Sequence, residues 1–154
     1  MKEKLGGILM SKMKMNVSGK SEVMKLNVKA GKHEIIVDEA TQMGGNDEGA
    51  NPLQYLLTSL VGCTNVVAHM AAKEMEFDLQ ELSIKVSGEF DPRGFMGDPN
   101  VRSHFETATL DVEVKTSESE ERLNELKEKV AARCPVYSTF VAADIEMTDT
   151  WTIV

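Results

Sequence analysis

The chain has 154 residues, of which 42% are hydrophobic and 27% charged, a composition typical of a globular domain with a substantial core. Its 25 acidic residues outnumber 17 basic ones, which gives a formal net charge of −8. That charge repels nucleic acid and anionic membrane surfaces, so neither is expected as a partner. Small molecules and proteins remain as possible classes of partner, and individual residues must indicate which class fits.

The first residues are basic and rich in methionine, but their apolar run, residues 8–10, is too short for the core of a signal peptide. We therefore predict a cytoplasmic protein with an N-terminal extension at residues 1–14, which can be disordered, and one domain at residues 15–154. Residues 49–72 carry no formal charge when His69 is neutral, and the stretch is long enough to cross a membrane. Its polar side chains favour a buried helix of a soluble protein instead; they include Gln54, Thr58, Ser59, Thr64, Asn65 and His69.

The segments before residue 44 alternate apolar and polar residues, which predicts three strands. These are MNVSGK (15–20), EVMKLNVKAG (22–31) and KHEIIVDEA (32–40). The sequence Ala30-Gly31-Lys32 indicates a tight turn between the second and third strands. The glycine-rich and acidic segment 44–51 is predicted to be a loop.

A long helix is predicted to begin at Pro52, with Asn51 as its N-cap, and to continue to about Met75. Apolar residues recur along it at helical spacing, and its other face has almost no charge before Lys73. This pattern predicts a central helix that is covered on most sides.

Two further strands are predicted at residues 82–90 and 104–116, with a long loop between them that contains two Asp-Pro pairs. Ser117 and Glu120 have the spacing of a capping box at the start of a second helix. That helix should end at Cys134, because the following Pro135 disfavours helical backbone in the residue before it. Pro135 then begins a third helix with Cys134 as its N-cap, and residues 144–154 form a last strand. The order β-β-β-α-β-β-α-α-β indicates an α+β fold with a largely antiparallel sheet.

The two cysteines allow two readings from the residues alone. Neither a structural disulfide nor a metal site is expected, because the chain has no CxxC motif, its three histidines are scattered, and cytoplasmic thiols stay reduced. No cofactor is expected either. Cys134 has a helix N-terminus and the adjacent Arg133 to lower its pKa, whereas Cys63 lies within a helix without such a field. Burial of a small apolar side chain explains each cysteine equally well.

Three segments resemble the OsmC/Ohr family, named for osmotically inducible protein C and organic hydroperoxide resistance protein. They are HEIIVDEATQMGGNDEGANPLQYLLTSLVGCT, VSGEFDPRG and RCPVYSTF. The resemblance implies an OsmC-like fold, with antiparallel sheets packed on two long central helices of an intertwined homodimer. It also implies that Cys63 attacks a hydroperoxide, that Cys134 then closes a disulfide with it, and that an external dithiol reduces the pair.

Two positions depart from the peroxidatic pattern of the family. Leu53 stands where a glutamate follows the Asn-Pro pair, and Lys20 stands in the early turn where an arginine is expected. Lysine lacks the planar fork of arginine, so the replacement is not conservative. Lys20, Glu48, Arg93 and Arg133 are the candidate supporting residues. The leading hypothesis is thiol-dependent reduction of organic hydroperoxides in oxidative-stress defence, and the alternative is an OsmC-like dimer without peroxidase activity that binds a small molecule or senses redox state.

Overall fold

The computed structural model describes residues 4–5, 8–9 and 12–154, so most of the predicted extension lies outside the described residues. The chain divides into two compact units, residues 1–52 and 53–154. The boundary falls at the start of the long helix. Each unit is described by itself.

The N-terminal unit is a three-stranded antiparallel sheet, which follows two very short paired strands, β1 (Lys4–Leu5) and β2 (Ile8–Leu9). Its strands are β3 (Ser18–Glu22), β4 (Lys25–Ala30) and β5 (His33–Val37), with β4 in the middle. The predicted turn at Gly31 is confirmed, since this glycine has a φ of 63°. A single 3-10 turn, η1 (Thr41–Met43), interrupts the long connection that follows.

The buried carboxylate of Asp38 holds this connection together. Its oxygens accept hydrogen bonds from the backbone N–H groups of Glu39, Asn46 and Glu48 at 2.8–3.1 Å. Burial raises the pKa of Asp38, but these N–H groups and the charge of Lys25 outweigh burial and leave the pKa below its usual value. The loop that leads into the long helix is therefore fixed by a charged group rather than by apolar packing.

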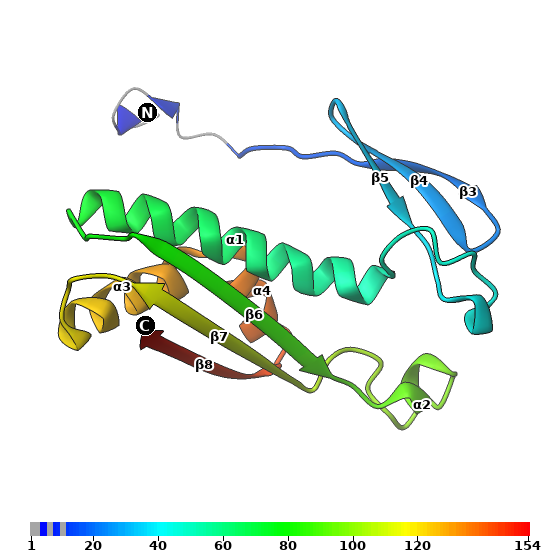
Figure 1. Cartoon of the computed structure of the whole chain (residues 1–154). Helices are drawn as coiled ribbons and strands as arrows, with labels where there is room; N and C mark the ends of the chain where they lie inside the picture. Colours follow the sequence, from blue (N-terminus) through cyan, green and yellow to red (C-terminus); the bar gives the residue numbers. More distant parts are fainter. Residues whose placement is uncertain (1–3, 6–7, 10–11) are drawn as a thin grey trace. The chain divides into compact units, whose positions relative to one another are not determined.

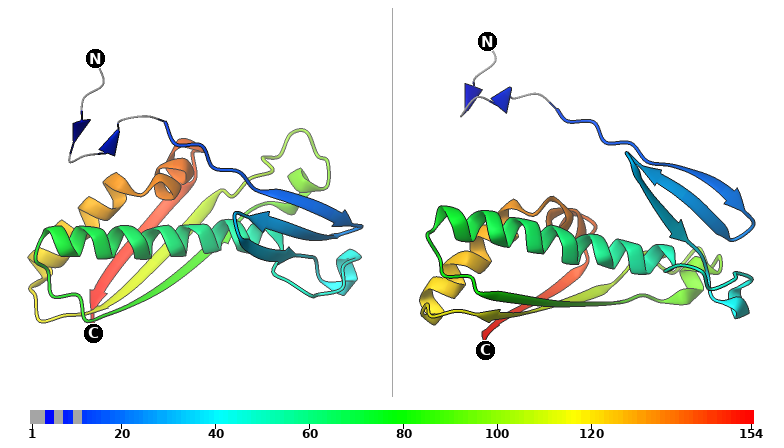
Figure 2. Two further views of the ribbon diagram at one scale, coloured as in Figure 1. Left: turned by 90° about the horizontal axis from the view of Figure 1, so that it is seen from above. Right: turned by 45° about the horizontal axis from the view of Figure 1, so that its top comes forward.

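In the C-terminal unit, the larger helices pack on one face of a second, three-stranded sheet (Figure 1, Figure 2). Its elements, in chain order, are α1 (Pro52–Glu74), β6 (Glu81–Glu89), the short α2 (Pro92–Phe95), β7 (Thr107–Lys115), α3 (Glu120–Arg133), α4 (Pro135–Ala142) and β8 (Glu146–Ile153). The α+β fold and the element order are confirmed. One helical turn, α2, lies in the segment predicted to be a loop.

The sheet of this unit is mixed rather than purely antiparallel. Strand β6 pairs antiparallel with β7, whereas β8 lies on the other side of β7 and runs parallel to it. The parallel pairing arises because α3 and α4 carry the chain back to the end of the sheet where β7 begins. Alternate residues of the strands face the helices, and the core lies between these two layers.

Two predicted helix features need correction. The N-cap of α3 is Ser119, whose hydroxyl accepts a hydrogen bond from the N–H of Arg122, whereas Ser117 donates to Asp78 at 2.6 Å. The long helix α1 is not covered on most sides within the chain: Leu60 is fully buried, but Val66 and Met70 are 55% and 50% exposed. By length and composition α1 qualifies as a membrane span, a test that the core helix of a soluble protein also passes.

Candidate thiol site

The fold brings the two cysteines together from distant segments of the C-terminal unit. Cys63 lies in the middle of α1 and is partly buried, and Cys134 lies at the junction of α3 and α4 and is fully buried. The two thiols lie close enough to interact, since Cys63 is among the groups that raise the pKa of Cys134. The spacing of the two cysteines in the sequence does not show whether they are close in space. The structure shows that they are.

The prediction that Cys134 is the N-cap of α4 is confirmed. Pro135 is the first helical residue, and the sulfur of Cys134 accepts a hydrogen bond from the backbone N–H of Tyr137 at 3.4 Å. The N–H of Cys134 donates to the carbonyl of Val130 and completes the last turn of α3. The thiol is therefore fixed by backbone on both sides.

The pKa of the Cys134 thiol is raised to about 11. Burial is the largest cause, and the neighbouring thiol of Cys63 acts in the same direction. The N–H groups of Tyr137 and Val136 at the start of α4 lower the pKa, as expected for a helix N-terminus, but they do not outweigh burial. Cys134 is therefore a protonated thiol at neutral pH, which corrects the expectation that its position would favour the thiolate.

Three of the four candidate supporting residues are held in ion pairs. Arg133 donates to both carboxylate oxygens of Glu74 at 2.6 and 3.0 Å, although it directly precedes Cys134. Arg93 donates to the carboxylate of Asp91 and lowers the pKa of Asp91 to about 2. Glu48 pairs with Lys25. Each of these charges is thus already matched within its own unit.

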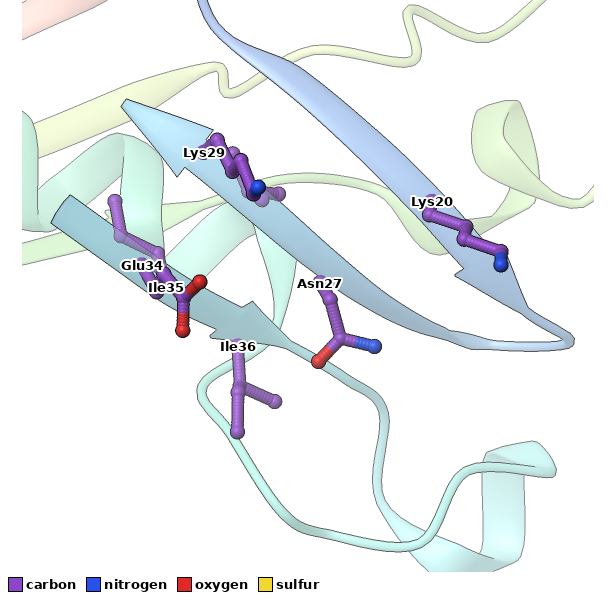
Figure 3. Close-up of a pocket in the computed structure, with 7 residues that line it drawn as sticks. Lys20, Asn27, Lys29, Glu34, Ile35 and Ile36 are labelled. Atoms are coloured by element: carbon purple, nitrogen blue, oxygen red, sulfur yellow. The ribbon is translucent and has the colours of Figure 1, made fainter. Parts of the chain in front are cut away.

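Lys20, the fourth candidate, lies on β3 in the N-terminal unit, and it forms no ion pair with another described residue. It lines an open hollow of about 450 Å³ on the sheet together with Asn27, Lys29, Glu34 and Ile36 (Figure 3). In the register of the sheet, Lys20 is opposite Asn27, which is in turn opposite Ile36. Lys20 is exposed within the chain.

Thr64 is a feature that sequence reasoning missed. It follows Cys63 in α1, it is fully buried, and its hydroxyl has no hydrogen-bond partner in the described part of the chain. A buried hydroxyl without a partner is uncommon and calls for an explanation. The polarity of Thr64 was visible in the sequence, but its burial depends on how α1 packs.

Among the described residues, no group of three or more His, Cys, Asp or Glu side chains has a geometry that could hold a metal ion.

The chain belongs to the OsmC family: the model of that family, described as OsmC-like protein, matches residues 44–148. A comparison with curated proteins finds no match. Solved structures share the fold at low sequence identity. An OsmC-like protein from Mycoplasma pneumoniae has a TM-score of 0.82 and 19% identity, with 94% of this chain and 99% of that chain covered.

Two similar structures are described as organic hydroperoxide resistance proteins. The one from Elizabethkingia anophelis has a TM-score of 0.74 and 18% identity over 95% of this chain and 100% of its own. OhrB of Bacillus subtilis has a TM-score of 0.63 and 18% identity over 90% and 98%. At these identities the structural likeness establishes the fold alone. The segment that the family model matches contains both cysteines.

Proposed function

We propose that the protein reduces organic hydroperoxides with Cys63 and Cys134 as its redox pair, as part of a cytoplasmic defence against oxidative stress. The observation that carries the proposal is the proximity of these two thiols, which come from distant segments of one unit and interact strongly enough to affect the pKa of Cys134. Family membership and the similar hydroperoxide resistance proteins support the substrate class.

In the first step, the thiolate of Cys63 attacks the terminal oxygen of ROOH. The O–O bond breaks, Cys63 becomes a sulfenic acid, and the alkoxide takes a proton and leaves as ROH. The raised pKa of Cys134 matters here, because a protonated thiol close to Cys63 can donate a hydrogen bond to the thiolate and stabilise its negative charge before attack. Cys134 therefore acts first as a hydrogen-bond donor.

In the second step, the sulfur of Cys134 attacks the sulfenic sulfur of Cys63, a disulfide forms, and water leaves. An external dithiol then reduces the disulfide by exchange and is itself oxidised. The balance is one ROOH and one dithiol consumed for one ROH, one water and one oxidised dithiol. Burial of Cys134 keeps it protonated until a neighbouring sulfenic acid forms, which limits its reaction with other oxidants.

The supporting cation in this proposal is Lys20, which has no carboxylate partner among the described residues, unlike Arg93 and Arg133. An ammonium group attracts both the thiolate and the peroxide oxygen, but only as a point charge. We therefore expect hydroperoxide turnover that is slower than with an arginine at position 20 but still measurable.

We propose that the active form is an interlocked homodimer in which the α1 helices of two copies face each other. Support comes from the outward face of α1, which has no charged residue before Lys73 and exposes Leu56, Val66 and Met70. A soluble protein seldom leaves such a face uncovered. Further support comes from the N-terminal sheet, because none of the apolar side chains between residues 12 and 52 is buried within the chain.

The test is consumption of cumene hydroperoxide by the full chain with dihydrolipoamide as the reductant. We expect multiple turnovers by the wild type, loss of activity to the uncatalysed rate in Cys63→Ser, and one rapid turnover followed by slow recycling in Cys134→Ser. Lys20→Met should reduce the rate, and Lys29→Met on the same sheet is its control. A wild type that turns over no faster than Cys63→Ser would exclude the peroxidase function.

The second candidate, a small-molecule binding or redox-sensing protein, is favoured by one observation. Leu53 provides no carboxylate to position a cation, and its side chain is packed against the apolar core. In this case the disulfide forms on exposure to peroxide but the rate does not depend on Lys20, so the same set of variants separates the two functions.

A further inference from the structure

An ion pair joins the C-terminal ends of the helices α1 and α3. Glu74 is the last residue of α1, and Arg133 is the last residue of α3, directly before Cys134. The nitrogens Nη1 and Nη2 of Arg133 donate to different carboxylate oxygens of Glu74, at 2.6 and 3.0 Å. Because the guanidinium is planar and rigid, such a pair with two hydrogen bonds fixes the orientation of both groups.

The end of α3 is thereby attached to α1 at two places. Cys134 lies close to Cys63, and Arg133 holds Glu74. Cys63 and Glu74 are separated by about 16 Å along the axis of α1, at 1.5 Å per residue. A single contact would allow the end of α3 to pivot about it, whereas two contacts at this separation also fix its direction. The ion pair therefore restricts the positions that the backbone of Cys134 can take.

The ion pair contributes little to the stability of the fold. The side chains of Arg133 and Glu74 are 38% and 55% exposed, and water and salt screen an ion pair at such a surface. The docking of α3 depends instead on its buried apolar face, which consists of Leu123, Leu126 and Val130. Because the pair lies beside Cys134, its effect on the geometry of the thiols is more important than its effect on folding.

The contacts of Arg133 do not favour a role as the cation that activates a thiol. Its guanidinium is occupied by Glu74, and these hydrogen bonds lower the pKa of the Glu74 carboxyl, so both groups are charged at neutral pH. The pKa of Cys134 is raised by burial and by Cys63, so the adjacent arginine does not hold Cys134 as a thiolate.

We propose that Glu74 and Arg133 are a positioning pair, which holds Cys134 within reach of Cys63 and favours closure of the disulfide between them. The proposal rests on the thiol pair of the proposed function, but it concerns the disulfide and not the reaction with a hydroperoxide. Without the ion pair, the two sulfurs sample a wider range of separations. The effective concentration of one thiol at the other is then lower.

The test is the redox equilibrium of the full chain with dithiothreitol. The two protein thiols transfer two electrons and two protons to oxidised dithiothreitol, which gives the protein disulfide and reduced dithiothreitol. Alkylation and mass spectrometry measure the fraction of disulfide within a single chain. We expect Glu74→Gln and Arg133→Gln each to lower the equilibrium constant for disulfide formation about threefold to tenfold. The double variant should lower it no further than either single variant.

Lys129→Gln is the matched control, because Lys129 lies on the same helix and acts on Glu74 through its charge alone. This variant should leave the equilibrium constant within about twofold of the wild-type value. A kinetic measurement adds a second readout: after addition of cumene hydroperoxide, the pair variants should accumulate more Cys63 sulfenic acid, which dimedone traps. The rate at which the sulfenic acid forms should be that of the wild type.

Three results would overturn the proposal: no disulfide in the wild type, equilibrium constants of both pair variants within twofold of the wild-type value, or an equal decrease in Lys129→Gln. A wild type that closes the disulfide with oxidised dithiothreitol but consumes no hydroperoxide would refute the peroxidase function and leave this proposal standing. Near-ultraviolet circular dichroism around Trp151 shows whether each variant is folded. The two single variants change different helices, so one misfolded protein leaves the other decisive.

Discussion

The two units of the chain are stabilised by different kinds of buried side chains. In the C-terminal unit, residues from α1, β7, α3 and α4 form one continuous buried core. In the N-terminal unit, the one fully buried side chain among residues 12–52 is the carboxylate of Asp38. The comparison shows that the N-terminal sheet rests on backbone pairing, and that a buried charge rather than an apolar core orders the connection that follows it.

The largest expected effect is on the C-terminal core. Leu60→Ala removes a fully buried side chain from α1 and should lower the free energy of unfolding by about 2–5 kcal/mol. Urea denaturation followed by the fluorescence of Trp151, which is the sole tryptophan and is buried, measures it. Val141→Ala, on an exposed position of α4, should change the value by less than about 0.5 kcal/mol. Equal effects of both changes would mean that the core is not the main source of stability.

The next prediction concerns the proposed dimer, in which a second copy covers apolar side chains that are exposed in a single chain. Val66→Glu places a charge on the outward face of α1 and should raise the dissociation constant of the proposed dimer by about a hundredfold or more. Sedimentation velocity measures this change, and Val154→Glu, at another exposed valine, is the control. In the monomeric variant, hydrogen exchange should accelerate in β3–β5 and stay slow in β7. A wild type that is monomeric at all concentrations contradicts the dimer.

Asp38 provides a narrower test of the N-terminal unit. Its pKa is lower in the folded state, so its contribution to stability is complete above its ordinary value of 3.8 and is lost as the pH falls through the folded value. Hydrogen exchange of the Glu39, Asn46 and Glu48 amides should therefore lose protection in acid, and Asp38→Asn should show this loss already at neutral pH. Asp47→Asn, at an exposed position of the same loop, should not.

The smallest effect is expected at the turn between β3 and β4. Val23 has a φ of 62°, a conformation that strains a β-branched residue, and it is 89% exposed. Val23→Gly should relieve this strain and stabilise the hairpin by about 1 kcal/mol. Slower exchange of the β3 and β4 amides is the measurement. Met24→Gly, where φ is negative, should instead weaken the hairpin, and stabilisation by both changes would show that strain at Val23 is not the cause.

Local sequence signals located the elements well, because proline and helix caps act over a few residues. Pro52 and Pro135 are the first residues of α1 and α4, as predicted. The same kind of reasoning chose Ser117 in place of Ser119 as the cap of α3, because two serines near a helix start satisfy similar patterns. Such an error of two residues is characteristic of helix ends.

What the sequence could not predict depends on long-range packing. The alternation of apolar and polar residues does not reveal that β8 pairs with β7 in parallel, because any strand with a similar pattern fits that edge of the sheet. The contact of Cys63 with Cys134 was implied only by family resemblance. The high pKa of Cys134 follows from complete burial, whereas the sequence showed only the helix start and Arg133, both of which point the other way. Glu74, which pairs with Arg133, is 59 residues away from it in the chain.

The central claim is that Cys63 and Cys134 form one redox couple, and a stoichiometric oxidation tests it most directly. One equivalent of cumene hydroperoxide is added to the fully reduced protein, the remaining thiols are alkylated, and peptides are mapped by mass spectrometry. The account predicts that both thiols are lost together and that one disulfide joins the peptides of Cys63 and Cys134 within a single chain. Retention of both free thiols, or oxidation of Cys63 to sulfinic acid while Cys134 stays reduced, would contradict it.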